Sequence, residues 1–76
     1  MNNERWFEIV SYVTERLKSE ADFTISHDSF FSRFGLTADD EHEIMMRLEE
    51  PVQRTWEMTT SGHGSLRVIV FRRKGR

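Results

Sequence analysis

Positively charged side chains gather at the carboxyl end of this 76-residue chain. Residues 61–76 read SGHGSLRVIVFRRKGR, a glycine-containing turn followed by an apolar stretch and a basic end. Guanidinium and ammonium groups bind phosphate oxygens through charge-assisted hydrogen bonds. The candidate nucleic-acid-binding residues are Arg54, His63, Arg67, Arg72, Arg73, Lys74 and Arg76. In the competing interpretation, basic side chains on an edge strand only discourage aggregation.

Acidic and basic residues are divided unevenly along the chain. Residues 1–50 contain 5 Lys/Arg against 12 Asp/Glu, a balance of −7, whereas residues 51–76 contain 6 against 1, a balance of +5. Such asymmetry indicates an electrostatic contact with a partner. It is equally compatible with two halves that neutralise each other inside the fold.

Two histidines lie in patterns that resemble reactive or metal sites. Asp39, His42 and Glu43 share a helical flank, a spacing that can direct three ligands to one cation. The second histidine of an HExxH motif is absent, so a solvated acidic face is favoured and no metal is predicted. His27 and Asp28 are neighbours in SHDS, which indicates a helix start because catalytic triads are not built from adjacent residues. We therefore predict no enzyme and no cofactor.

The stretch GHGS at residues 62–65 resembles a phosphate-binding loop only in its glycines. A P-loop has a longer glycine pattern, with Lys and Ser/Thr at the start of a helix. This stretch leads into an apolar strand and predicts a hairpin tip, from which His63 can contact a ligand. Trp6 and Phe7 can stack on bases, but anchoring the first helix in the core is the favoured role.

Composition predicts one small folded domain over residues 1–76. Apolar residues make up 37% of the chain, with six Phe and two Trp, enough for one compact core. The chain has no cysteine, which excludes disulfides and thiolate metal sites. No apolar stretch approaches the roughly 20 residues that span a bilayer, and MNNERW is unlike a signal peptide. We expect a cytoplasmic protein without a membrane partner.

Hydrophobic spacing predicts the elements that position these residues. In residues 2–20 the apolar positions recur every three or four residues, which predicts a helix; they are Trp6, Ile9, Val10, Val13 and Leu17. Phe23 and Ile25 alternate with polar residues and predict a short strand. A second helix follows, capped by Ser26 and ended by Gly35, with an apolar side formed by Phe30, Phe31 and Phe34.

A third helix and a hairpin complete the chain. Thr37 and Asp40 resemble a capping box, and Pro51 ends a helix predicted over residues 38–49, with Ile44, Met45 and Leu48 facing inward. Two strands then flank TSGHGS, whose glycines suit positive φ angles. Val52, Trp56 and Met58 share a face of the first strand; Leu66, Val68 and Val70 share one face of the second, and Arg67, Ile69 and Phe71 the other.

This order, α-β-α-α-β-β, is an α+β arrangement that resembles the winged-helix family. FFSRFGLT, residues 30–37, is similar to that family's turn between two helices. The positions that fit are Phe30, Phe34, Gly35, Leu36 and Thr37, whereas Phe31 stands where the family usually has a small residue. The resemblance implies that residues 38–49 form the recognition helix and residues 59–66 the wing.

In most winged-helix proteins the recognition helix enters the DNA major groove. Here that helix contains several acids and a single base, Arg47, so phosphates would repel it. We therefore predict a small regulatory protein that associates with nucleic acid or a transcription complex through a basic wing and tail.

Two other hypotheses remain open. In the first, an acidic adaptor or inhibitor, of the kind found in phages, docks on another protein through helix 38–49; its contact residues are Asp39, Asp40, Glu43, Met46 and Arg47. In the second, the chain forms a homodimer through the hairpin edge or the first helix.

Overall fold

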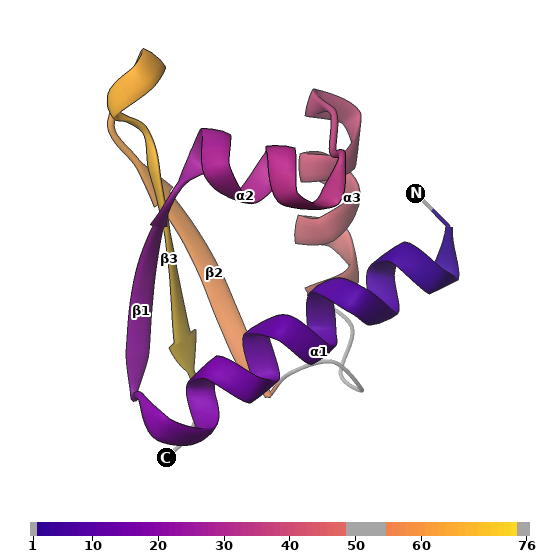
Figure 1. Ribbon diagram of the computed structural model, residues 1–76, viewed down its shortest axis with the longest axis vertical. Helices are drawn as coiled ribbons and strands as arrows, with labels where there is room; N and C mark the ends of the chain where they lie inside the picture. The colour runs from indigo at the N-terminus through magenta and orange to yellow at the C-terminus, as the bar shows by residue number, and fades with distance from the viewer. Residues whose placement is uncertain (1, 49–54, 75–76) are drawn as a thin grey trace.

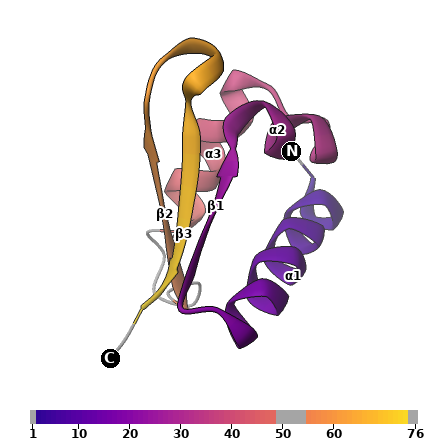
Figure 2. The same ribbon diagram turned by 60° about the vertical axis from the view of Figure 1, so that its left-hand side comes forward.

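The computed structural model describes residues 2–48 and 55–74, which form three helices and a three-stranded antiparallel sheet. In chain order the elements are α1 (Asn3–Ser19), β1 (Asp22–Ser26), α2 (His27–Phe34), α3 (Ala38–Leu48), β2 (Trp56–Ser61), the short 3-10 turn η2 (Gly64–Leu66) and β3 (Val68–Arg73). The strand order is β1-β3-β2, and the helices lie on one side of the sheet (Figures 1 and 2). The predicted α+β fold and its element order are confirmed.

Helix α1 forms as its apolar spacing predicts. The Asn2 side chain accepts a hydrogen bond from the Arg5 backbone N–H at 2.7 Å, which satisfies a donor at the helix start. The helix then buries Trp6, Ile9, Val13 and Leu17 against the sheet. The core prediction is right for Trp6 and wrong for Phe7, which is 71% exposed because it lies one position round the helix from the buried stripe.

The caps of α2 follow the sequence prediction. The Ser26 hydroxyl accepts from the Ser29 backbone N–H at 3.0 Å, and Gly35 adopts a left-handed conformation with φ 62° at the other end. Glycine suits this position because a side chain there would be strained. Phe31, the residue that departs from the winged-helix pattern, stacks on the His27 ring with centroids 4.1 Å apart. A large side chain therefore fits where the family has a small one.

Helix α3 begins at the predicted capping box. The Asp40 carboxylate accepts from the Thr37 backbone N–H at 2.9 Å and from its hydroxyl at 3.2 Å. Of the three side chains predicted to face inward, Ile44 is fully buried and Leu48 packs against the core. Met45 is 40% exposed, so its inward prediction is wrong: it follows Ile44 directly and lies about 100° further round the helix. Pro51 lies outside the described residues.

Strand β3 is the central strand of the sheet, and its side chains alternate between the two faces. Ile69 and Phe71 face the helices and are fully buried, and Trp56 and Met58 of β2 lie on the same side. On the opposite face, Thr24, Val70 and Thr59 lie side by side in register. The faces predicted for Ile69, Phe71, Val68 and Val70 are therefore right, while Val52 and Arg54 lie outside the described residues.

The turn between β2 and β3 uses both of its glycines at positive φ, as expected. Gly62 has φ 87° and Gly64 has φ 57°. A Cβ atom on Gly62 would lie 2.6 Å from the Leu66 carbonyl oxygen, so a larger residue would displace the turn. Leu66 itself belongs to η2 and is 80% exposed, which corrects its prediction as a strand residue that shares a face with Val68.

Aromatic rings dominate the small core. Phe30 lies at its centre, within 5.1 Å of Phe34 and 5.2 Å of Phe71 between ring centroids, and Trp6 approaches Trp56 at 6.5 Å. In the described part of the chain, no helix combines the length and the apolar character required to cross a membrane.

The burial of Phe30 generates a stability prediction. We expect Phe30→Ala to lower the free energy of unfolding by about 3–5 kcal/mol, because it removes a ring that no solvent reaches and leaves a cavity. Phe7→Ala makes the same chemical change at an exposed site and should cost below about 0.5 kcal/mol. Urea unfolding followed by tryptophan fluorescence measures both, and equal losses would contradict the described core.

Candidate functional site

Most basic side chains of the described residues are already bound to carboxylates. The ion pairs are Arg5–Glu8 at 3.5 Å, Arg16–Glu20 at 3.2 Å, Lys18–Glu15 at 3.4 Å, Arg47–Glu43 at 2.9 Å and Arg67–Glu41 at 2.8 Å. Within residues 2–48 and 55–74, the bases that make no ion pair are Arg33 and the three consecutive residues Arg72, Arg73 and Lys74. Unmatched positive charge therefore occurs at two places, one on α2 and one at the end of β3.

Arg72, Arg73 and Lys74, called here the basic strand end, are all exposed. They lie at the end of the sheet away from the β2–β3 turn (Figure 1). Hydrogen bonds fix the backbone on both sides: the Arg73 N–H donates to Ala21 O at 3.1 Å and the Lys74 N–H to Thr55 O at 3.2 Å. Three cations are thus carried on an ordered backbone.

The side chains of the basic strand end differ in their surroundings. Arg72 is paired in register with Asp22 on one side and Glu57 on the other, so nearby carboxylates partly offset its charge. Arg73 points to the other face of the sheet, opposite Trp56 in register. Neighbouring strands therefore place carboxylates opposite Arg72 but a tryptophan opposite Arg73, so the charge of Arg73 is less offset.

A hollow of about 360 Å³ adjoins Arg73 between the end of α1 and the start of β2. Its lining consists of two cations, two threonines and two apolar side chains, namely Lys18, Arg73, Thr14, Thr55, Leu17 and Trp56. Lys18 extends from the last turn of α1 into this region, and its pair with Glu15 is exposed to solvent on both sides and therefore weak. Ammonium, guanidinium and hydroxyl groups together are donors that suit phosphate oxygens.

Arg67 differs from Arg72, Arg73 and Lys74 because its guanidinium is half-buried and bound to a carboxylate of α3. It donates to Glu41 Oε2 at 2.8 Å, while Glu41 Oε1 contacts His27 Nε2 at 3.2 Å. The His27 backbone N–H also donates to Arg67 O at 3.0 Å. These contacts join the hairpin, α2 and α3. Sequence analysis missed them because the partners are 14 and 26 residues apart and no local spacing connects them.

The predicted nucleic-acid-binding residues therefore do not form a single patch. His63 is exposed at the turn between β2 and β3, whereas Arg72, Arg73 and Lys74 lie at the other end of the sheet (Figure 1). Arg54 and Arg76 lie outside the described residues. Lys18, which lines the hollow beside Arg73, is absent from the residues selected on sequence.

On α3, some residues of the alternative protein-binding site are hydrogen-bonded within the fold, and others are exposed to solvent. Asp40 caps the helix through Thr37, and Glu43 accepts two hydrogen bonds from Arg47 at 3.1 and 2.9 Å. Arg47 also lies over the Trp6 ring at 5.4 Å. The outward side instead presents exposed side chains, namely Asp39, His42, Met45 and Met46. In the described ranges, no three carboxylate or imidazole groups lie close enough together to hold a metal ion.

Comparison of the chain with protein-family models, with curated proteins and with solved structures gave no match. The winged-helix resemblance therefore stays a prediction drawn from residues 30–37 and the element order.

The α3 cap generates a pH prediction. The Thr37 backbone N–H holds the pKa of Asp40 below its ordinary value, because it donates to the ionised carboxylate. A lowered pKa in the folded state gives stability that is present above the unfolded pKa and is lost as the pH falls through the folded pKa. We expect Asp40→Asn, which keeps an oxygen acceptor, to show a shallower loss of unfolding free energy between about pH 5 and pH 2. Urea unfolding across that range tests this, and equal acid slopes for the two proteins would contradict it.

Proposed function

We propose that this chain is a small regulatory protein of the cytoplasm that binds nucleic acid, alone or within a transcription complex, through its basic strand end. The single observation that carries this proposal is that Arg72, Arg73 and Lys74 are exposed and form no ion pair with any described residue. Among residues 2–48 and 55–74, the other bases apart from Arg33 hold carboxylates and have less capacity for an external anion.

Binding at the strand end would be directed at the phosphate backbone rather than at base edges. Neutralising phosphates releases counterions, and this release drives sequence-independent association. Lys18 and the hollow beside Arg73 extend the positive surface to the end of α1. Because these groups donate to phosphates and carry no base-reading pattern, we expect weak sequence preference.

The surface that the winged-helix resemblance would assign to DNA is unsuited to it. Helix α3 has Asp39, Asp40 and Glu41 in its first turn, and the neighbouring Arg67 is already bound to Glu41. Phosphates brought to this surface would meet carboxylates without a free arginine. The proposed approach is therefore at the opposite end of the sheet.

The proposal predicts a salt-dependent affinity that the basic strand end controls. The parent protein should lose affinity for a short DNA duplex as salt rises from about 50 to about 200 mM, with a slope near −3 for three phosphate contacts. Changing Arg72, Arg73 and Lys74 together to Ala should weaken binding at least about tenfold and flatten the slope. Fluorescence anisotropy with a labelled duplex measures both quantities, and circular dichroism confirms that the variant is folded.

Arg67→Ala is the matched control, because this arginine lies on the same hairpin but is bound to Glu41. Provided that circular dichroism shows it to be folded, it should change the affinity less than about twofold, because Glu41 already offsets its charge. Salt-insensitive binding by the parent, or equal losses from Arg67→Ala and from the triple variant, would contradict binding at the strand end.

A second function, docking on another protein, is favoured by the outward side of α3. Met45 and Met46 are 40% and 58% exposed, beside Asp39 and His42. Exposed methionines adapt to varied partner surfaces, and clustered apolar side chains mark interaction sites. The acids at the start of the helix would favour a partner with a basic surface.

This second function predicts that changes on α3 abolish complex formation. We expect the double variant Asp39→Lys and Met46→Lys to lose a partner that the parent retains on an affinity column, because it inserts positive charge at the contact. The variant Glu4→Lys with Phe7→Lys alters exposed acidic and apolar residues on α1 in the same way and should retain the partner. Equal retention by both double variants would exclude α3 as the contact surface.

A further inference from the structure

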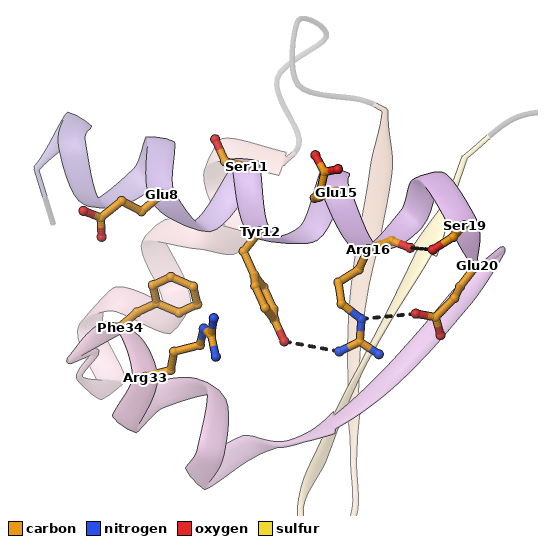
Figure 3. A pocket seen from close by; sticks show the side chains of 9 residues that line it. All are labelled: Glu8, Ser11, Tyr12, Glu15, Arg16, Ser19, Glu20, Arg33 and Phe34. Atoms are coloured by element: carbon orange, nitrogen blue, oxygen red, sulfur yellow. Dashed lines mark hydrogen bonds and ion pairs between the residues drawn. The ribbon is translucent and has the colours of Figure 1, made fainter.

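Arg33 is the second place where positive charge is unmatched, and it borders a hollow between α1 and α2. This groove of about 840 Å³ runs along α1 and is closed on one side by the end of α2 (Figure 3). Its lining residues from α1 are Glu8, Ser11, Tyr12, Glu15, Arg16, Ser19 and Glu20, and those from α2 are Arg33 and Phe34. None of the functions above uses this groove.

The wall of the groove is aromatic and holds Arg33 in a defined position. The Tyr12 ring meets Phe34 edge to face with centroids 5.6 Å apart. The Arg33 guanidinium lies over the Tyr12 ring at 4.5 Å and near Phe34 at 5.9 Å (Figure 3). Stacking fixes the guanidinium plane while its N–H groups stay available at the edge, the geometry that binds a carboxylate with two hydrogen bonds.

The carboxylates that line the groove already have basic partners. Glu8 pairs with Arg5, Glu15 with Lys18 and Glu20 with Arg16, so three bases on α1 offset three acids. Arg16 is further held by Tyr12, whose hydroxyl accepts from it at 3.3 Å, and by the Phe23 ring, 4.1 Å from its guanidinium carbon. The Arg33 side chain makes no ion pair or hydrogen bond with any described residue, so the unmatched charge in the groove is positive.

We propose that this groove binds a peptide segment of a partner protein in which an acidic side chain is next to an aromatic or large aliphatic one. The carboxylate would pair with Arg33, and the apolar side chain would lie against Tyr12 and Phe34. This site is separate from the basic strand end and from the outward side of α3. It would give the protein a specific partner as well as a general affinity for phosphates.

The shape and charge of the groove favour a peptide over other anions. The lining from Glu8 to Glu20 covers about 18 Å along the helix at 1.5 Å per residue, the length of five or six extended peptide residues. The groove is open along this length rather than enclosed around a small molecule (Figure 3). A single carboxylate needs only Arg33, whereas a nucleic acid presents a row of phosphates, and the other base in the described lining, Arg16, is already paired with Glu20.

The test uses two blocked pentapeptides as probes. One contains a phenylalanine followed by a glutamate among glycines, and the other has glutamine in place of the glutamate. We expect the glutamate peptide to shift the NMR signals of Tyr12, Arg33 and Phe34 and to bind at least about tenfold more tightly than its glutamine twin, because one charge-assisted bidentate contact is lost.

Variants assign the effect to Arg33. Arg33→Gln should bind the two peptides equally weakly, whereas Lys74→Gln removes the same charge elsewhere and should leave the tenfold preference intact. Arg33→Lys keeps the charge but not the planar fork and should lose most of the preference. The duplex affinity of Arg33→Gln should equal that of the parent, so failure of this proposal and failure of nucleic-acid binding can be told apart.

Three results would overturn the proposal. The first is equal affinity for the two peptides, and the second is a set of shifts centred on α3 or the basic strand end. The third is binding of 3-phenylpropionate at the groove while the peptide does not bind, which would assign the site to a small acid instead.

Discussion

The Glu41 carboxylate contacts both His27 and Arg67, and the relative placement of the hairpin, α2 and α3 depends on these two contacts. The carboxylate joins His27 at the start of α2 to Arg67, the residue before β3, and a backbone hydrogen bond from His27 to Arg67 closes the connection. Because the Arg67 and Glu41 side chains are only 35% and 22% exposed, their pairing is less screened than a surface ion pair. The same contact occupies Arg67, so the surface between hairpin and helix loses the positive charge that phosphate binding requires.

Three arginine guanidinium groups lie over aromatic rings at the edge of the core. Arg16 lies over Phe23, Arg33 over Tyr12 and Arg47 over Trp6, and each of these rings also contacts another aromatic ring. A chain of 76 residues has few apolar side chains to exclude water, and the stems of long basic residues add cover while their charged ends stay hydrated. Arg16 and Arg47 do so with a carboxylate partner, whereas Arg33 does so without one.

Local signals in the sequence predicted most of the fold and little of the site. Ser26, Gly35 and the Thr37–Asp40 box fixed the ends of helices because capping acts over three or four residues. Alternation placed Ile69 and Phe71 on a common face for the same local reason, and the structure shows that this face is the buried one. The pairing of Arg67 with Glu41 and the place of Arg33 over Tyr12 join distant segments, and no periodicity encodes them. The exposure of Phe7, Met45 and Leu66 likewise depends on where each element meets its neighbours.

The two backbone hydrogen bonds at residues 73 and 74 have an entropic consequence. A flexible basic tail would lose backbone freedom on every residue that a partner orders, at a cost of about 1–2 kcal/mol each. Here the Arg73 and Lys74 N–H groups are already held by Ala21 and Thr55 of the neighbouring segments. A partner would then restrict only side-chain rotamers, because the backbone entropy of these residues is already lost when the protein folds.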